Sequence, residues 1–386
     1  MNPPILDRLA ALTAEGRFEE ALTLSAPLAA QPDASSQVLA DHSALLKAVG
    51  RREEALAFDH RAIARIGARS GVPWHNLAAT LGDLGRGRES REACEKAFAL
   101  GLDAAETWGV YARALLAVGE HDAAEDAYRQ SLARAGNNTK VAAEYADILW
   151  MRRGEVGEAL AVLDSSFRAG GAPAPLVIAK ARLLAASGDP GMAADLLGSA
   201  ALSLPHDATL GLAAAQAAVE QGRLVEAEAF LKRAQGRSRD LLNQWAIVHL
   251  AAGRPAEALA VAREGLALYP GDQSLLGWAA TAARAAGDPL YAELCDYPAM
   301  VGVYDIDPPA GWSSQQVFLA DLAAALGPMH VYQQHPSTQS LRHGSQTTHL
   351  LTGSEHPAIQ GFFRAVAPAI REHMARLAPG RSGDYR

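Results

Sequence analysis

Small apolar residues recur along the chain at a fixed distance from a glycine. A Gly is followed five residues later by Ala, often with Glu just before it, and the unit occurs nine times with Gly85–Ser90 as the one variant. Its glycines are Gly16, Gly50, Gly85, Gly119, Gly154, Gly188, Gly222, Gly253 and Gly287, separated by 34, 35, 34, 35, 34, 34, 31 and 34 residues. Such a period is typical of a helix pair that buries its apolar face only by stacking on its neighbours.

We expect each glycine in the turn between the two helices of a pair, in the left-handed conformation that Gly adopts without a Cβ penalty. The periodicity places the first helices near residues 4–15, 37–49, 73–84, 105–118, 139–153, 175–187, 208–221, 240–252 and 273–286. It places the second helices near 19–30, 53–66, 88–100, 122–135, 157–169, 191–203, 225–235, 256–268 and 290–296. Alanines on one face of the second helices, such as Ala227 and Ala234, permit close helix contact.

One interval departs from the period, since Gly222 and Gly253 are 31 residues apart. A helix that loses three residues turns its apolar face away from the core. We therefore expect the loss in the loop Gly236-Arg237-Ser238-Arg239.

Tryptophan and proline also keep fixed positions in the repeat. Trp74 and Trp108 lie eleven residues before a repeat glycine, and Pro205 and Pro270 lie seventeen residues after one. In this the chain resembles the tetratricopeptide repeat family over residues 1–296. The resemblance implies an all-α superhelical solenoid of antiparallel helix pairs, with a concave face built mainly from the first helices. An ordinary Ala-rich helical bundle, the alternative, gives no reason for a nine-fold register.

If the chain lines a groove as this family does, side chains six and ten residues before each glycine point into it. The polar residues at these positions include His75, Arg113, Glu144, Arg182, Gln216 and Asn243. Residues four apart share a helix face, so such side chains together could bind an extended peptide. The resemblance thus implies a protein or peptide partner in the concave face. The alternative is that these are solvated polar positions without a ligand.

Composition argues against several other classes of partner. The chain has 35 basic and 43 acidic residues, a net charge of −8, without the clustered basic stripe of a nucleic-acid-binding surface. No apolar stretch is long enough for a transmembrane helix, and the N-terminus lacks the pattern of a secretory signal. The two cysteines, Cys94 and Cys295, form no disulfide framework. We expect a cytoplasmic protein that binds neither nucleic acid nor membrane.

The register stops after Ala292, and the composition changes from residue 297. Six of the twelve histidines lie between residues 330 and 373, and Lys is absent. Runs of β-type residues at Met300–Ile306 and Met329–Tyr332 predict strands, while helices are expected at 315–326 and 357–377. We therefore expect a repeat domain, 1–296, followed by a small, incomplete α+β segment, 297–386.

The stretch from His335 to Thr348 resembles a motif at the start of 2-oxoglutarate/Fe(II) oxygenase domains that follow tetratricopeptide arrays, as do the stretches 301–305 and 308–312. The positions that recur in that family correspond to Gln339, Ser340, Arg342, Gly344, Gln346 and Thr347. The resemblance implies a dioxygenase whose complete domain would use Fe(II) and 2-oxoglutarate.

Such enzymes hold iron with two His and usually one carboxylate. The resemblance implies a His-x-Asp/Glu or His-x-His pair, yet no histidine here is followed two residues later by Asp, Glu or His. His335, His343 and His349 lie on a predicted loop without a carboxylate, and His335 before proline is expected to be a turn residue. We expect no cofactor for this chain as given. Two hypotheses remain: an interaction scaffold with an incomplete oxygenase-like domain, and a hydroxylase that recruits a protein substrate with its repeats but lacks its catalytic half.

Overall fold

The computed structural model describes residues 3–66, 69–339, 344, 346–347 and 351–377. Regular structure in these residues is helical throughout. The chain divides into two compact units, one of residues 1–145 with 347–354 and the other of residues 146–346 with 355–386. The predicted boundary at residue 296 is not tested by this division and stays a prediction.

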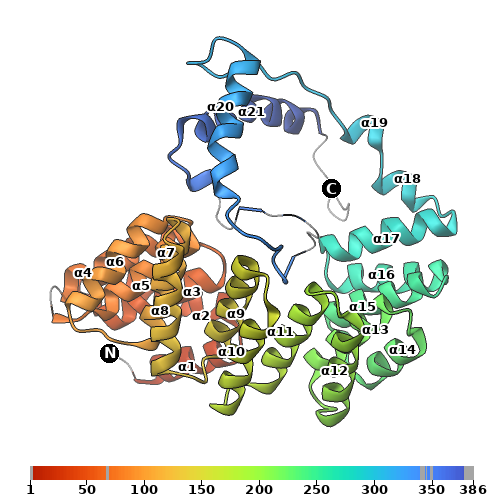
Figure 1. The fold of residues 1–386 in the computed structure, drawn as a ribbon, viewed down its shortest axis with the longest axis horizontal. Coiled ribbons are helices and arrows are strands. Elements are labelled where there is room, and N and C mark those ends of the chain that lie inside the picture. Colours follow the sequence, from red (N-terminus) through yellow and green to blue (C-terminus); the bar gives the residue numbers. More distant parts are fainter. Residues whose placement is uncertain (1–2, 67–68, 340–343, 345, 348–350, 378–386) are drawn as a thin grey trace. The chain divides into compact units, whose positions relative to one another are not determined.

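The first unit is a stack of helix pairs (Figure 1). Its helices are α1 (Pro3–Ala14), α2 (Phe18–Ala29), α3 (Ser36–Ala48), α4 (Arg52–Ile66), α5 (Val72–Asp83), α6 (Gly87–Ala99), α7 (Ala105–Ala117) and α8 (His121–Arg134), followed by α9 (Thr139–Arg153), which spans the division. From α1 to α8, each helix contacts the next along the chain, and α5 also contacts α3 and α7. First helices of successive pairs therefore lie next to one another.

The second unit continues the same order (Figure 1). Its repeat helices are α10 (Val156–Arg168), α11 (Pro173–Ala186), α12 (Pro190–Ser203), α13 (Ala208–Glu220), α14 (Leu224–Arg233), α15 (Arg239–Ala251), α16 (Pro255–Leu268), α17 (Gln273–Ala286) and α18 (Leu290–Leu294). Here α13 contacts α11 and α15, and α15 contacts α17. Consecutive first helices again share a face.

The glycine turns are confirmed. All nine repeat glycines have a positive φ, between 68° and 103°. An L residue with a Cβ is strained in this conformation, so Gly is the residue that lets the chain reverse after each first helix. The predicted helix boundaries agree with the structure to within two residues.

The repeat alanines of the second helices are buried, apart from Ala292 in α18. Ala21, Ala55, Ala124, Ala227 and Ala258 have no exposed surface. Each helix pair and its neighbours enclose a small apolar cluster of their own, such as the one formed by α13, α14 and α15. Stability is therefore distributed along the stack, as in other repeat architectures.

The prediction for the short interval was wrong. The chain between α14 and α15, residues 234–238, is no shorter than the corresponding stretch 204–207. Instead α14 has 10 residues, whereas the second helices from α2 to α16 otherwise have 12 to 15. Residues removed from the end of a helix leave the apolar face of the remaining turns unrotated.

The predicted α+β character of residues 297–386 is also corrected. The described elements are α19 (Tyr297–Met300), α20 (Gln315–Leu326), the 3₁₀ helices η2 (Gly327–Met329) and η3 (Leu351–Gly353), and α21 (Pro357–Arg376). Residues 301–309 and 330–332 have no regular structure. A strand needs a neighbouring strand to pair its backbone N–H and C=O groups, and the described part of the chain supplies none.

Helices α20 and α21 contact each other, and Trp312, which precedes α20, lies against both. The rings of Trp312 and Phe318 are 5.2 Å apart, and a Cβ on Gly361 would lie 3.0 Å from Trp312. The absence of a side chain at Gly361 therefore lets α21 approach Trp312 closely.

The packing predicts the effect of enlarging a repeat alanine. Ala227→Leu forces extra methylene and methyl groups into a fully buried contact, which should lower the free energy of unfolding by about 1–3 kcal/mol. Ala292 occupies the same repeat position in α18 but is exposed, so Ala292→Leu should change it by less than about 0.5 kcal/mol. Denaturant unfolding of both variants is the measurement. Equal changes in the free energy of unfolding for the two variants would show that Ala227 does not lie in the helix interface.

Candidate functional site

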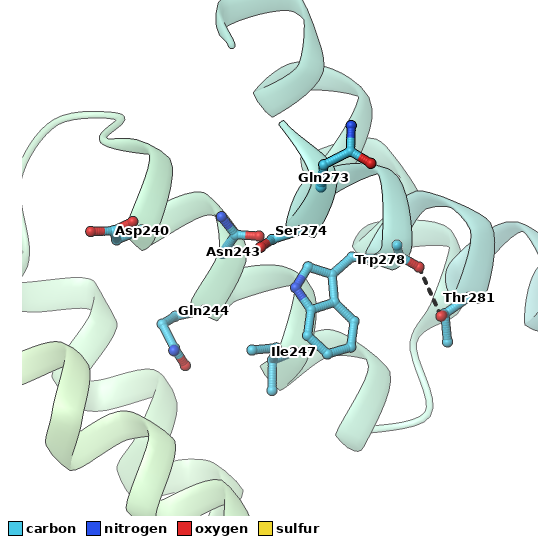
Figure 2. A pocket seen from close by; sticks show the side chains of 9 residues that line it. Asp240, Asn243, Gln244, Ile247, Gln273, Ser274, Trp278 and Thr281 are labelled. Carbon is cyan, nitrogen blue, oxygen red and sulfur yellow. Dashed lines mark hydrogen bonds between the residues drawn. The ribbon is translucent and has the colours of Figure 1, made fainter. Parts of the chain in front are cut away.

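A cleft of about 520 Å³ lies between the first helices α15 and α17 of the second unit. Figure 2 shows the side chains that line it. They are Asp240, Asn243, Gln244 and Ile247 from α15 and Gln273, Ser274, Gly277, Trp278 and Thr281 from α17. The walls are thus built by two successive first helices.

The repeat explains why these residues meet. Asn243 and Ile247 lie ten and six residues before the glycine that follows α15, and Gly277 and Thr281 hold the same two positions in α17. Residues four apart share one helix face, and α15 contacts α17 directly. Equivalent faces of neighbouring repeats therefore line a single opening. Of the six polar groove candidates, Asn243 is the one in this cleft.

Small side chains keep the cleft open. Gly277 is exposed in the middle of α17, and a Cβ built on it meets nothing within 4 Å. The hydroxyl of Thr281 donates to the Gly277 carbonyl at 2.8 Å, which holds that side chain against its own helix. Trp278 is half-buried and packs against the apolar cluster of α15, α16 and α17. The Trp278 indole therefore lines one side of the cleft, next to the open space above Gly277.

Amide side chains provide hydrogen-bonding capacity. Asn243 donates through Nδ2 to the Arg239 carbonyl at 3.0 Å, while its Oδ1 is buried without a partner in the described residues. Gln244 Oε1 is in the same condition. A buried acceptor without a partner costs free energy, and rotation toward a ligand N–H would relieve it. The cleft can therefore accept backbone N–H donors beside an apolar surface.

Three other groove candidates belong to the first unit, where they are bonded to protein groups. His75 Nδ1 on α5 is 3.1 Å from the hydroxyl of Thr107 on α7. Arg113 on α7 donates to Glu144 on α9 at 2.9 Å. These contacts join successive first helices, so the side chains act at least as braces between repeats.

The remaining two groove candidates lie outside the α15–α17 cleft. Arg182 is exposed on α11. Gln216 on α13 donates to Glu220 of the same helix at 2.9 Å. Binding at any of the six candidates stays a prediction.

The oxygenase-like positions are only partly described. The side chains of Gln339 and Gln346 are hydrogen-bonded to each other, Gly344 is exposed and Thr347 is half-buried. Ser340 and Arg342 lie outside the described residues. The contact between the two glutamines supplies no metal ligand.

The described residues do not fit an iron centre. Among them no three His, Cys, Asp or Glu side chains come together as a metal site would need, and His343 and His349 lie outside the described residues. His335 is not a turn residue: it is buried, with its ring edge-on to Trp150 at 6.1 Å.

Burial raises the pKa of Cys94 to about 12, so this thiol stays protonated near neutral pH.

The sequence did not single out two prominent residues of the cleft. Gln244 and Trp278 both lie nine residues before a repeat glycine, one residue after the predicted groove position. Their shared repeat position was the available signal. It becomes informative only once α15 and α17 are known to lie side by side.

Comparison with known families finds a match to the family described as "Tetratricopeptide repeat". The matched segments are residues 105–130, 174–199, 208–233 and 246–264, so these parts of the chain carry tetratricopeptide repeats. The last of them includes Ile247 of the cleft. A comparison with curated proteins finds no match.

Three solved structures have partial similarity to this chain. A structure described as the functional characterization of Pseudomonas aeruginosa pilF is 16% identical, covering 55% of this chain and 97% of its own, with a TM-score of 0.39. PilW, described as a widely conserved type IV pilus biogenesis factor, is 20% identical over 52% and 96%, with a TM-score of 0.39. The APC/C hetero-tetramer Cut9-Hcn1 is 18% identical over 72% and 55%, with a TM-score of 0.42. No conclusion about function rests on overlaps at these TM-scores.

Across the described helices, none combines the length and the apolar character that crossing a bilayer requires.

His75 offers a test of the contacts in the first unit. Burial lowers the pKa of His75 below its ordinary value of 6.5, and the positive charge of Lys47 lowers it further. The histidine should therefore be neutral at pH 7, and its contribution to stability, present above pH 6.5, should be lost as the pH falls through the lowered pKa. An NMR titration, with the signal assigned by His75→Gln, should give a midpoint below 6.5. A midpoint at or above that value would contradict the buried position.

Proposed function

We propose that this array of tetratricopeptide repeats is an interaction scaffold that binds an extended peptide of a protein partner on the face of its first helices. The α15–α17 cleft is the main site. The observation that carries the proposal is that the cleft is lined at the same repeat positions from two neighbouring first helices and is left open at Gly277.

The lining indicates the chemistry of the ligand. Ile247 and Trp278 offer an apolar surface for one side chain, while Asn243 and Gln244 offer amides that can pair with peptide N–H and C=O groups. A volume of about 520 Å³ is in the range of ordinary ligand clefts. The ligand would therefore be an extended segment with an apolar residue flanked by free backbone groups, held along the face of the first helices.

A substitution that fills the cleft tests the proposal. Peptides are first selected on the wild-type chain from a display library of random sequences, and the best is titrated by calorimetry. Gly277→Leu projects a side chain into the open floor and should weaken binding at least about tenfold, or about 1.4 kcal/mol. Helix stability should not fall, since Leu is the better helix former by up to about 1 kcal/mol.

A matched control is available on a second helix. Gly157→Leu adds the same side chain to α10, outside the cleft, at a position where a Cβ likewise meets nothing within 4 Å. This variant should keep wild-type affinity. Equal affinities for the Gly277 and Gly157 variants would exclude the cleft as the peptide site.

The region from residue 297 on resembles an oxygenase segment, but its described residues form no group of metal ligands. The rival hypothesis, a 2-oxoglutarate-dependent hydroxylase, needs two histidines and a carboxylate around one iron ion. Its support is the resemblance of the stretch around Gln339 and Gln346, and no contact in the described residues adds to it.

Titration tests whether the residues of this chain by themselves bind iron and 2-oxoglutarate. Calorimetry of the purified chain with Fe(II) and 2-oxoglutarate under anaerobic conditions should give no saturable signal, because a partial ligand set is not held in place for the metal. A saturable signal that His335→Ala abolishes would overturn the scaffold hypothesis and favour the hydroxylase.

A further inference from the structure

A segment of the C-terminal region, residues 332–337, lies along the last two turns of α9 within the second unit. The indole Nε1 of Trp150 donates to the carbonyl of His335 at 2.9 Å. The backbone N–H of Ser337 donates to the carboxylate of Asp147 at 3.0 Å. Two side chains of α9 are thus paired with main-chain groups of a segment about 185 residues away in sequence.

The end of α9 adds a third contact. The Met151 carbonyl accepts hydrogen bonds from the N–H groups of Gln333 and Gln334, at 2.8 and 3.0 Å. Carbonyls in the last turn of a helix have no partner within the helix, and α9 ends at Arg153. The segment supplies the missing donors.

The segment also has side chains that are buried. Tyr332 and His335 are 5% and 4% exposed, Pro336 is buried, and the His335 ring meets the Trp150 indole edge-on at 87°. By contrast, Thr338, the next residue after the segment, is exposed. Main-chain hydrogen bonds together with a few buried side chains are the usual means by which proteins bind extended peptides.

We propose that the end of α9, at Asp147, Trp150 and Met151, is a second peptide-binding site and that residues 332–337 are its intramolecular ligand. A tethered ligand is present at a high effective concentration, so an external peptide of the same chemistry binds only after the segment is displaced. The chain therefore occupies its own site. This site shares no residue with the α15–α17 cleft, and the inference does not depend on the function proposed for that cleft.

The test displaces the segment without altering the site. In the double variant Gln333→Pro/Gln334→Pro, both N–H donors to the Met151 carbonyl are lost, while α9 is unchanged. The matched control, Gln333→Ala/Gln334→Ala, removes the same two side chains but keeps both N–H groups. The probe is a fluorescent synthetic peptide of residues 329–339, and its binding to each full-length chain is measured by anisotropy.

The peptide should bind the proline variant on the order of a hundredfold more tightly than it binds the wild type or the alanine control. Adding Trp150→Phe, which removes the indole N–H donor, should weaken that binding, whereas adding Gly277→Leu should leave it unchanged. Hydrogen exchange at residues 332–337 should be faster in the proline variant alone. Equal binding to all three chains, or no binding to a proline variant whose segment exchanges freely, would overturn the inference.

Discussion

The turn at each repeat glycine is the constraint on which the structure depends. A positive φ at all nine glycines reverses the chain after each first helix. In the second helices from α2 to α16, the residue five positions after the glycine, an Ala or Ser90, is buried. Because Gly253 and Gly287 are 34 residues apart, equivalent residues of α15 and α17 align. The α15–α17 cleft follows from this alignment, together with a glycine where a side chain would otherwise fill the space.

Local signals in the sequence were enough for the repeat helices, because glycine turns and apolar periodicity act within a few residues. They were not enough for the short interval, because the missing residues came from the end of α14, which has 10 residues. They also failed for 300–306 and 329–332, since β-type residues form strands only with a partner strand, and that partner is not a local property.

The site shows the same division between local and tertiary information. Counting back from the glycines found Asn243, but the list of polar residues left out Ile247, Gly277 and Thr281 at equivalent positions. These three residues matter because together they line the α15–α17 cleft, which a single position does not reveal. His335 was assigned to a turn from the proline after it, whereas its burial comes from Trp150, which a local pattern cannot reveal.

Side-chain NMR tests most directly whether a protein partner is held on the first-helix face at the α15–α17 cleft. The amide signals of Asn243 and Gln244 and the indole N–H signal of Trp278 are recorded while a library-selected peptide is added to the full-length chain. These three signals should shift together and saturate at the peptide's measured affinity. If they stay in place while the peptide binds and shifts signals of the second helices, binding at this cleft is contradicted.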